Sequence, residues 1–218
     1  MRKSSTKAPP KRRRNAAATR DAILASARRA FARSGYDGAG VREIAQGAGV
    51  TAMLVNRYFG SKEQLFAEVT ADTMAAPIIL VPEILGSATP GADIAAALIG
   101  LTAAGQTPLD GFLIMLHSAS SRRAAEIGRA EIEKGHQKSL TGALSGRFAP
   151  QRAALVLSLV AGVQVMRQMI GLSALAQAEP EVLIALLAPL IQQLIDGEDS
   201  PAAKRPSARR PSRRGSSR

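Results

Sequence analysis

The chain has 218 residues, contains no cysteine or tryptophan, and carries a formal net charge of +12. The lack of cysteine excludes disulfides, thiolate nucleophiles and cysteine metal sites, and it suits a reducing compartment. Aromatic residues make up 3% of the chain. The core must therefore be built from Ala, Leu, Ile, Val and Met, which is typical of a helical protein, and the length allows a small module joined to a larger domain.

The positive charge lies at the two ends of the chain. Residues 1–20 carry eight Lys or Arg and residues 200–218 carry seven, with no acid in either range. The residues between them carry the other 14 Lys or Arg and all 17 Asp or Glu, so this part of the chain is slightly acidic. Both ends are rich in Ser, Pro and Ala, and they have too few bulky apolar residues to build a core. We therefore predict a disordered basic arm at 1–14 and a disordered basic tail at 198–218.

No segment is typical of secretion or of membrane insertion. No apolar run follows the basic N-terminal residues, as a signal peptide would require. The longest apolar stretch, 153–175, is interrupted by Gln164, Arg167 and Gln168, which disfavours a transmembrane helix. We expect a soluble, cytoplasmic protein with no membrane partner.

The first predicted helix runs from Asn15 to Ser34. Apolar residues recur there with a helical period, Phe31 is the largest of them, and Gly35 follows as a helix cap. The arginines at 12–14 come directly before this helix. They suit either a flexible arm that reaches DNA phosphates or a narrow groove, or a solvated basic segment.

A helix-turn-helix pattern follows between Val41 and Lys62. The first helix has an apolar face, Gly49 stands where the chain must turn, and Thr51 is placed to cap a second helix. Helices this short need a third one for support, which the first predicted helix provides. In such a motif the second helix lies in the major groove of DNA.

The next residues predict a phosphate contact. Gly60 ends the second helix, Ser61 caps another, and Lys62 falls in its first turn, where the helix dipole alone would favour an acid. A cation in that position is well placed for a DNA phosphate, and the backbone N–H groups at the helix start point the same way.

At these residues the chain resembles the tetracycline-repressor (TetR) family of transcriptional regulators. The resemblance covers about Arg20 to Phe66 and depends on Ile23-Leu24, Phe31, Gly35-Tyr36, Val41-Arg42-Glu43-Ile44-Ala45, Gly49-Val50-Thr51 and Tyr58-Phe59-Gly60-Ser61-Lys62-Glu63. Two features depart from the family pattern. Ala39 and Gly40 stand where the family usually has hydroxyl residues, and Asn56 stands where many members have tyrosine.

The candidate DNA-binding residues divide into base readers and phosphate contacts. Asn56 and Arg57 have the strongest base-reading chemistry, because Asn can bind adenine and Arg can bind guanine through paired hydrogen bonds. Thymine methyl groups suit contacts with small or apolar side chains, and phosphates suit the basic and hydroxyl groups; a salt bridge is an equal alternative for Arg42. The full candidate set is Arg42, Thr51, Ala52, Met53, Asn56, Arg57, Tyr58 and Lys62.

The remaining sequence predicts further helices, in an all-α fold. A connecting helix runs to about 76, where prolines and glycines indicate a domain boundary. We expect a DNA-binding domain with its connecting helix at 15–76 and a helical effector-binding and dimerisation domain at 77–197. Helices are predicted from a cap at Asp93 to Ala104, from Thr107-Pro108 to Ser120, and over 122–144, where Glu126, Arg129 and Glu133 are spaced to pair.

The last two predicted helices are the most apolar. They run from Ala149-Pro150 to about Ala176 and from Glu179-Pro180 to Ile195, where Gly197 stops the second. Each is apolar around more of its circumference than a surface helix needs, so each either fills a domain core or contacts a second copy. The resemblance implies the second alternative, a two-chain four-helix bundle through 150–176 and 179–195, which would hold two motifs on a palindromic operator.

The candidate effector contacts each have an alternative role in the core of the domain. His117 is either a hydrogen-bonded core residue or a polar group that orients a ligand. Methionines at helical spacing are more often plain core than a ligand site. The sequence does not name a partner for Arg167. The ligand-binding candidates are Phe112, Met115, His117, Met166 and Met169.

We predict no enzymatic activity, cofactor or metal. No nucleophile or acid–base cluster is present, and the spacing of Glu133 and His136 is weak evidence for a metal. The sequence predicts a homodimeric transcriptional regulator that binds double-stranded DNA, in the form of a repressor released by a small hydrophobic effector. The alternative is an architectural protein that coats DNA through its basic ends, with little sequence preference.

Overall fold

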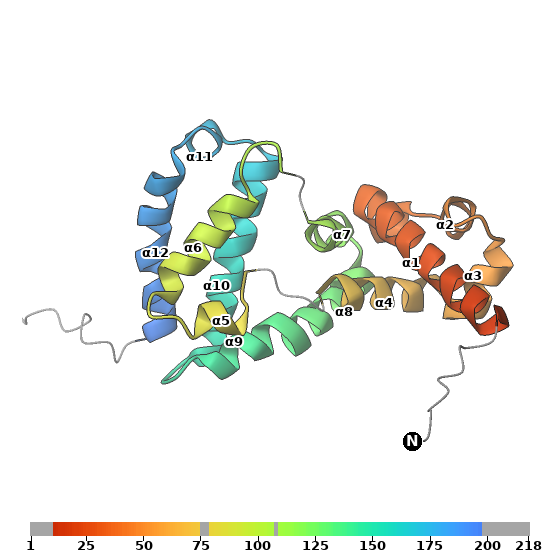
Figure 1. Cartoon of the computed structure of the whole chain (residues 1–218), viewed down its shortest axis with the longest axis horizontal. Coiled ribbons are helices and arrows are strands. Elements are labelled where there is room, and N and C mark those ends of the chain that lie inside the picture. The colour runs from red at the N-terminus through yellow and green to blue at the C-terminus, as the bar shows by residue number, and fades with distance from the viewer. Residues whose placement is uncertain (1–10, 75–78, 107–108, 198–218) are drawn as a thin grey trace, which may run out of the picture.

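The structure, a computed structural model, describes residues 11–74, 79–106 and 109–197, with side chains from residue 16 onward (Figure 1). Every element in this described part is helical, which confirms the predicted all-α class. Helices α1 to α4 gather at one end of the molecule, and α6, α10 and α12 gather at the other. Most of the predicted arm and tail lies outside the described residues.

The N-terminal end contains α1 (Lys11–Gly38), α2 (Val41–Gly47), α3 (Ala52–Phe59) and α4 (Lys62–Met74). Helix α1 begins four residues before the predicted start at Asn15. Gly35 interrupts it with φ of 65°, a conformation that glycine adopts without steric cost. The prediction that the first helix ends at this glycine is therefore confirmed, since only a short helical segment follows it.

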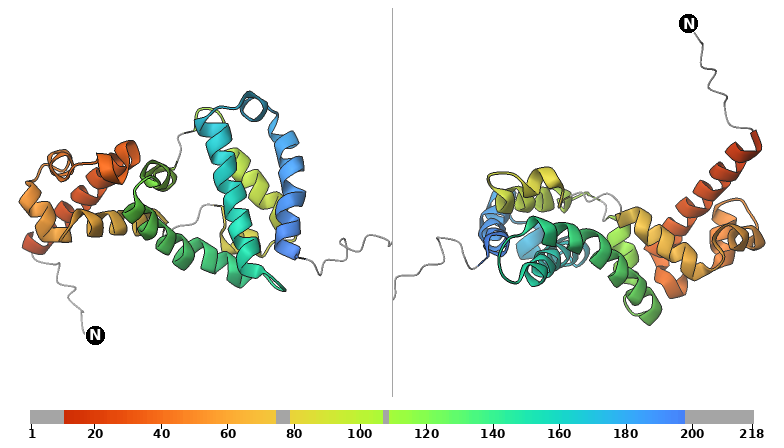
Figure 2. Two further views of the ribbon diagram at one scale, coloured as in Figure 1. Left: turned by 180° about the vertical axis from the view of Figure 1, so that it is seen from behind. Right: turned by 90° about the horizontal axis from the view of Figure 1, so that it is seen from below.

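Two elements that follow α4 complete the N-terminal core. They are α7 (Asp110–Ser118), which packs along α1, and α8 (Arg122–Ile132), which packs on α4. Ile114 of α7 and Ala124 of α8 are fully buried in the same cluster as Phe31 and Phe66. From there α8 continues toward the far end of the molecule, as the views in Figure 2 show.

The second core lies among α5 (Pro82–Leu85), α6 (Pro90–Leu101), α10 (Ala149–Val163) and α12 (Pro180–Asp196). Two π-helical segments adjoin these elements: η1 (Glu133–Gln137) joins α8 to α9 (Lys138–Ala143), and η2 (Gln164–Met169) continues α10. A short helix, α11 (Ser173–Ala176), precedes α12. The predicted end of the last helix before Gly197 is confirmed, with φ of 76° at that glycine.

Two predicted boundaries in this half are wrong. The helix predicted to start at a cap on Asp93 begins at Pro90 instead, because proline is preorganised for the first helical position; the Asp93 carboxylate accepts hydrogen bonds from Ser87 and Thr89. The helix predicted to reach Ala176 stops near Met169, since Gly171 takes φ of 69°. The predicted start at Thr107-Pro108 lies outside the described residues.

Two buried arginines bind carbonyl groups at helix ends. Arg167 donates from Nη1 to the backbone oxygen of Ile99 at 2.6 Å and to Oγ1 of Thr102 at 2.8 Å, and from Nε to the backbone oxygen of Leu175 at 3.1 Å. Arg152 donates to the backbone oxygens of Leu194 and Ile195 in the last turn of α12. Cations are favourable there because a helix C-terminus carries partial negative charge.

These arginines also bear on membrane insertion. By length and composition, the run Ala149–Met169 qualifies as a span. However, Arg152, Gln164 and Arg167 along it are buried against other parts of the fold, and the run packs on α12 and α9. We read it as a helix of the folded domain.

Candidate nucleic-acid interface

The turn of the helix-turn-helix has the predicted geometry. Gly49 adopts φ of 67°, and a side chain there would be strained by the backbone conformation alone, since no atom lies within 4 Å of its Cβ position. The backbone N–H of Val50 donates to the backbone oxygen of Ala45 at 2.9 Å. The hydroxyl of Thr51 accepts from the backbone N–H of Leu54 at 3.3 Å, as expected for the cap of α3.

The outer face of α3 is open to solvent. Val55 and Phe59 are buried in the N-terminal core, and α3 packs on α2 and α4. The side chain of Met53 is 81% exposed, and Asn56 and Arg57 are exposed one helical turn further on. The predicted base readers therefore occupy one accessible face of the helix.

The other two candidates on α3 have a second role. Ala52 and Tyr58 are partly buried and pack against the N-terminal core. The Tyr58 ring lies 6.4 Å from the Phe59 ring, between centroids. These two residues help to anchor α3, and only part of each side chain remains accessible.

Two of the predicted phosphate contacts, Arg42 and Lys62, lie on the helices before and after α3, in the first turns of α2 and α4. Gly60 ends α3 with φ of 77°, and the Ser61 hydroxyl accepts from the backbone N–H of Gln64 at 3.1 Å, so both predicted caps are confirmed. Lys62 Nζ lies 4.7 Å from the ring centroid of Tyr36 and 3.5 Å from the backbone oxygen of Asp37. Arg42 is exposed in the first turn of α2, and it forms no ion pair within the described residues.

Several acids of this region already have basic partners. Arg20 pairs with Glu68 and Arg28 with Asp72, which joins α1 to α4, and Arg33 pairs with Glu43. Exposed pairs contribute at most about 1 kcal/mol each to stability. These pairs neutralise the carboxylates of Glu43 on α2 and of Glu68 and Asp72 on α4.

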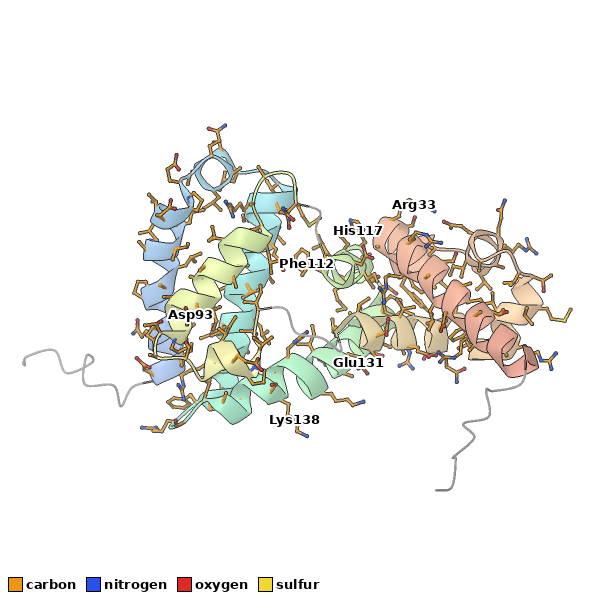
Figure 3. The ribbon with its side chains drawn as sticks, in the orientation of Figure 1. Arg33, Asp93, Phe112, His117, Glu131 and Lys138 are labelled. Atoms are coloured by element: carbon orange, nitrogen blue, oxygen red, sulfur yellow. The ribbon has the colours of Figure 1, made fainter. Side chains whose placement is uncertain are left out.

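The structure does not gather the ligand-binding candidates into one cavity. Met115 lines an open hollow of about 260 Å³ between α7, α8 and η1. His117 is exposed, and its Nδ1 lies 2.6 Å from the backbone oxygen of Ala32 on α1. Figure 3 shows Phe112 and His117 on different sides of α7. On η2, Met169 is partly buried and Met166 is 48% exposed.

The predicted pairing among Glu126, Arg129 and Glu133 is wrong, because no ion pair among the described residues includes Arg129. Glu126 pairs with Arg123 at 3.1 Å and with Arg122 at 3.5 Å, and the described residues show no ion pair between Arg129 and Glu133. Arg123 also donates from Nε to Glu63 at 2.7 Å, across to α4. Its hydrogen bonds to Glu63 and then to Glu126 raise the pKa of Arg123.

Two family descriptions match this chain. Residues 23–69 match "Bacterial regulatory proteins, tetR family", and residues 88–195 match "Tetracyclin repressor-like, C-terminal domain". The chain belongs to the TetR family. As members of this family are transcriptional regulators, the protein is a DNA-binding regulator and not an enzyme.

Solved structures agree with this assignment. A transcriptional regulator from Rhodococcus sp. Rha1 is 26% identical, with a TM-score of 0.57 over 80% of this chain and 95% of its own. A putative regulator from Pseudomonas aeruginosa PAO1 is 20% identical, with a TM-score of 0.60 over 87% and 94%. AibR, solved with isovaleryl coenzyme A and operator DNA, is 19% identical, with a TM-score of 0.55 over 79% and 97%. Comparison with curated protein sequences gives no significant match.

Proposed function

We propose that this TetR-family protein is a homodimeric repressor that reads a palindromic operator with α3 of each subunit. The observation that carries the proposal is the accessible face of α3, where Met53, Asn56 and Arg57 lie together while Val55 and Phe59 hold the helix from behind. This arrangement fits a helix whose side chains contact base edges in the major groove. Arg42 and Lys62 flank that face and would contact phosphates.

The proposed dimer rests on an apolar face of α10, η2 and α12. Large apolar side chains are half or more exposed there, including Leu155 at 52%, Ile170 at 67% and Leu186 at 63%. A surface of this kind on a soluble protein is typical of an association site. The small exposed residues Ser158 and Gly162 lie on the same face of α10 and would allow close helix contact. Met166, Val182 and Leu190 complete this dimer face.

The proposed effector is a small, hydrophobic molecule bound in the cytoplasm. Residues 88–195 match the tetracyclin repressor-like C-terminal domain, and AibR, which has a similar fold, was solved with isovaleryl coenzyme A and operator DNA. Of the sequence candidates, Met115 lines the open hollow between α7, α8 and η1 and is the contact that we propose, whereas Phe112, His117, Met166 and Met169 lie outside that hollow. An effector releases DNA only through its difference in affinity between the two conformations of the dimer.

Selection from a random duplex pool tests the function. Full-length protein and a version trimmed to residues 11–197 would each be mixed with the pool at physiological salt. We expect both to recover the same inverted repeat, with half-sites about one helical turn apart. Loss of nearly all binding on trimming, with no motif recovered, would instead support the DNA-coating alternative.

Single substitutions distinguish the base-reading residues from the phosphate contacts. Asn56→Ala should relax specificity at one operator position by about 1–3 kcal/mol, because it removes a base contact. Lys62→Ala should weaken binding to all sequences alike and lower the salt slope by about 1 for each contact. Gln46→Ala, at an exposed position on α2, is the control. Identical behaviour of the first two variants would contradict the division of roles.

A further inference from the structure

The segment Tyr36–Asp37 lies between Lys62 and the turn that joins α7 to α8. We use the term α7–α8 turn for residues 119–121 together with Ser118, the last residue of α7. This turn belongs to the polypeptide that follows the connecting helix, whereas Lys62 starts that helix. Both contact the same two residues. The effector half of the chain therefore reaches a predicted DNA contact through one intermediate segment.

Tyr36 and Asp37 provide a seat for the ammonium group of Lys62. Nζ lies 4.7 Å from the centroid of the Tyr36 ring and 3.5 Å from the Asp37 backbone oxygen. An aromatic face attracts a cation, and a lysine has three donors, so this seat leaves donors free for a phosphate oxygen. The contact restricts the long side chain before DNA binds, which lowers the entropy lost on binding.

The Tyr36 ring is itself fixed by the N-terminal core. Its centroid lies 5.0 Å from that of Phe66, edge to face, and 6.4 Å from that of Phe31; both phenylalanines are fully buried. Burial, followed by the carboxylates of Glu63 and Asp37, raises the pKa of the Tyr36 hydroxyl. The ring thus has one side in the core and an edge near the charged start of α4.

The α7–α8 turn forms hydrogen bonds with both residues of this seat, Tyr36 and Asp37. The hydroxyl of Ser118 accepts from the backbone N–H of Tyr36 at 2.9 Å, and the hydroxyl of Ser121 donates to Oδ1 of Asp37 at 3.2 Å. Both serines are buried, at 2% and 8% exposure, so these bonds are shielded from competing water. Arg123, at the start of α8, binds Glu63 next to Lys62.

We infer that Tyr36 is a positioning residue for the phosphate contact of Lys62, and that the α7–α8 turn controls this position through Ser118 and Ser121. The inference rests on the proposed function, in which Lys62 binds a DNA phosphate. A displacement of the turn would move the backbone of Tyr36 and the side chain of Asp37, and the ammonium group would lose its seat. DNA affinity would then fall without any change on the base-reading face of α3.

A double-mutant cycle on the full-length protein tests the positioning role. Binding to a mixed-sequence duplex would be measured over a range of salt concentrations for wild type, Lys62→Ala, Tyr36→Leu and the double variant. Each lost phosphate contact lowers the slope of log K against log salt by about 0.9, so a dimer that loses two contacts changes by about 2. We expect Tyr36→Leu to lower the slope in the same way as Lys62→Ala, and the double variant to add nothing.

Tyr36→Phe separates positioning from a purely structural role. It keeps the aromatic face and should retain the wild-type slope, whereas Tyr36→Leu keeps an apolar side chain without that face. Thermal unfolding of each variant shows whether Tyr36→Leu is folded. A wild-type slope for folded Tyr36→Leu, or additive effects in the double variant, would overturn the inference. A wild-type slope for Lys62→Ala would instead contradict the proposed phosphate contact of Lys62.

The role of the turn has a separate test that leaves the aromatic core intact. The pair Ser118→Ala and Ser121→Ala removes both hydrogen bonds, and Ser120→Ala is the matched control, because Ser120 is exposed and its hydroxyl forms no hydrogen bond among the described residues. We expect the pair to lower the salt slope on the mixed-sequence duplex and the control to leave it unchanged. Equal slopes for the pair and the control would show that the turn does not act on Lys62.

Discussion

The two ends of the molecule differ in how completely each buries its apolar side chains. In helices α1 to α4 the large apolar residues are buried around Phe31 and Phe66, and Met53, on the face proposed to contact DNA, is the one that is strongly exposed among the described residues of these helices. Helices α10 and α12 instead expose several, including Leu155 and Leu186. One end therefore buries its large apolar residues within a single chain, and the other leaves several exposed, which is the face that we propose a second copy covers.

A charge on the proposed dimer face should have the largest effect, because it would prevent a second copy from covering the exposed apolar side chains. Leu186→Glu places a carboxylate in the centre of the proposed contact, where burial without a partner is very unfavourable. We expect a monomer in sedimentation velocity and loss of binding to an inverted repeat, because half-sites need two linked motifs. Ala130→Glu, at an exposed position on α8, should remain dimeric. A dimer in Leu186→Glu would place the contact elsewhere.

A cavity in the N-terminal core tests the other end. Phe31 is fully buried and contacts Phe66 edge to face with centroids 5.0 Å apart. Phe31→Ala should cost about 3–5 kcal/mol of unfolding free energy. Phe148→Ala is the control, because that ring is 51% exposed, and we expect a change of about 0.5 kcal/mol or less. Chemical denaturation measures both, and equal losses would contradict the packing described.

A smaller effect concerns pH. Burial lowers the pKa of His136 below its usual 6.5, so near and below pH 6.5 the unfolded chain binds more protons than the folded one. The contribution of His136 to stability therefore falls as pH drops through this range. His136→Gln should show a weaker loss of stability than wild type between about pH 7.5 and about pH 5.5 in urea unfolding. Parallel curves would show that His136 is not the group responsible.

The sequence predicts those features whose causes are local. Gly49, Thr51, Gly60 and Ser61 act within their own turns, and the structure places each in its predicted role. The resemblance to the TetR family was likewise carried by residues close together in the sequence. Local signals also compete, however, as at Asp93, where a plausible cap lies one turn inside a helix that begins with proline.

Contacts between segments that are distant in the chain could not be predicted from the sequence. Arg167 binds the end of α6 through groups 65 and 68 residues away, and no residue type at either position names the other. His117 was placed among ligand candidates, yet its ring binds a backbone oxygen of α1, which could not be foreseen from its apolar neighbours. The position of Tyr36 between Lys62 and Ser118 was missed for the same reason, although Gly35-Tyr36 formed part of the family pattern.

The close approach at Gly35 limits how the two halves of the molecule can move. A Cβ atom at Gly35 would lie 2.2 Å from the backbone oxygen of His117, so α1 and α7 meet main chain to main chain, with no side chain between them to yield. Such a contact resists compression, so α7 cannot move closer to α1 at this point. In the proposed dimer, a ligand that pushes α7 toward α1 would therefore carry the helix-turn-helix with it and change the separation of the two copies of α3, whereas this contact does not resist a movement of Ser118 and Ser121 away from Tyr36 and Asp37.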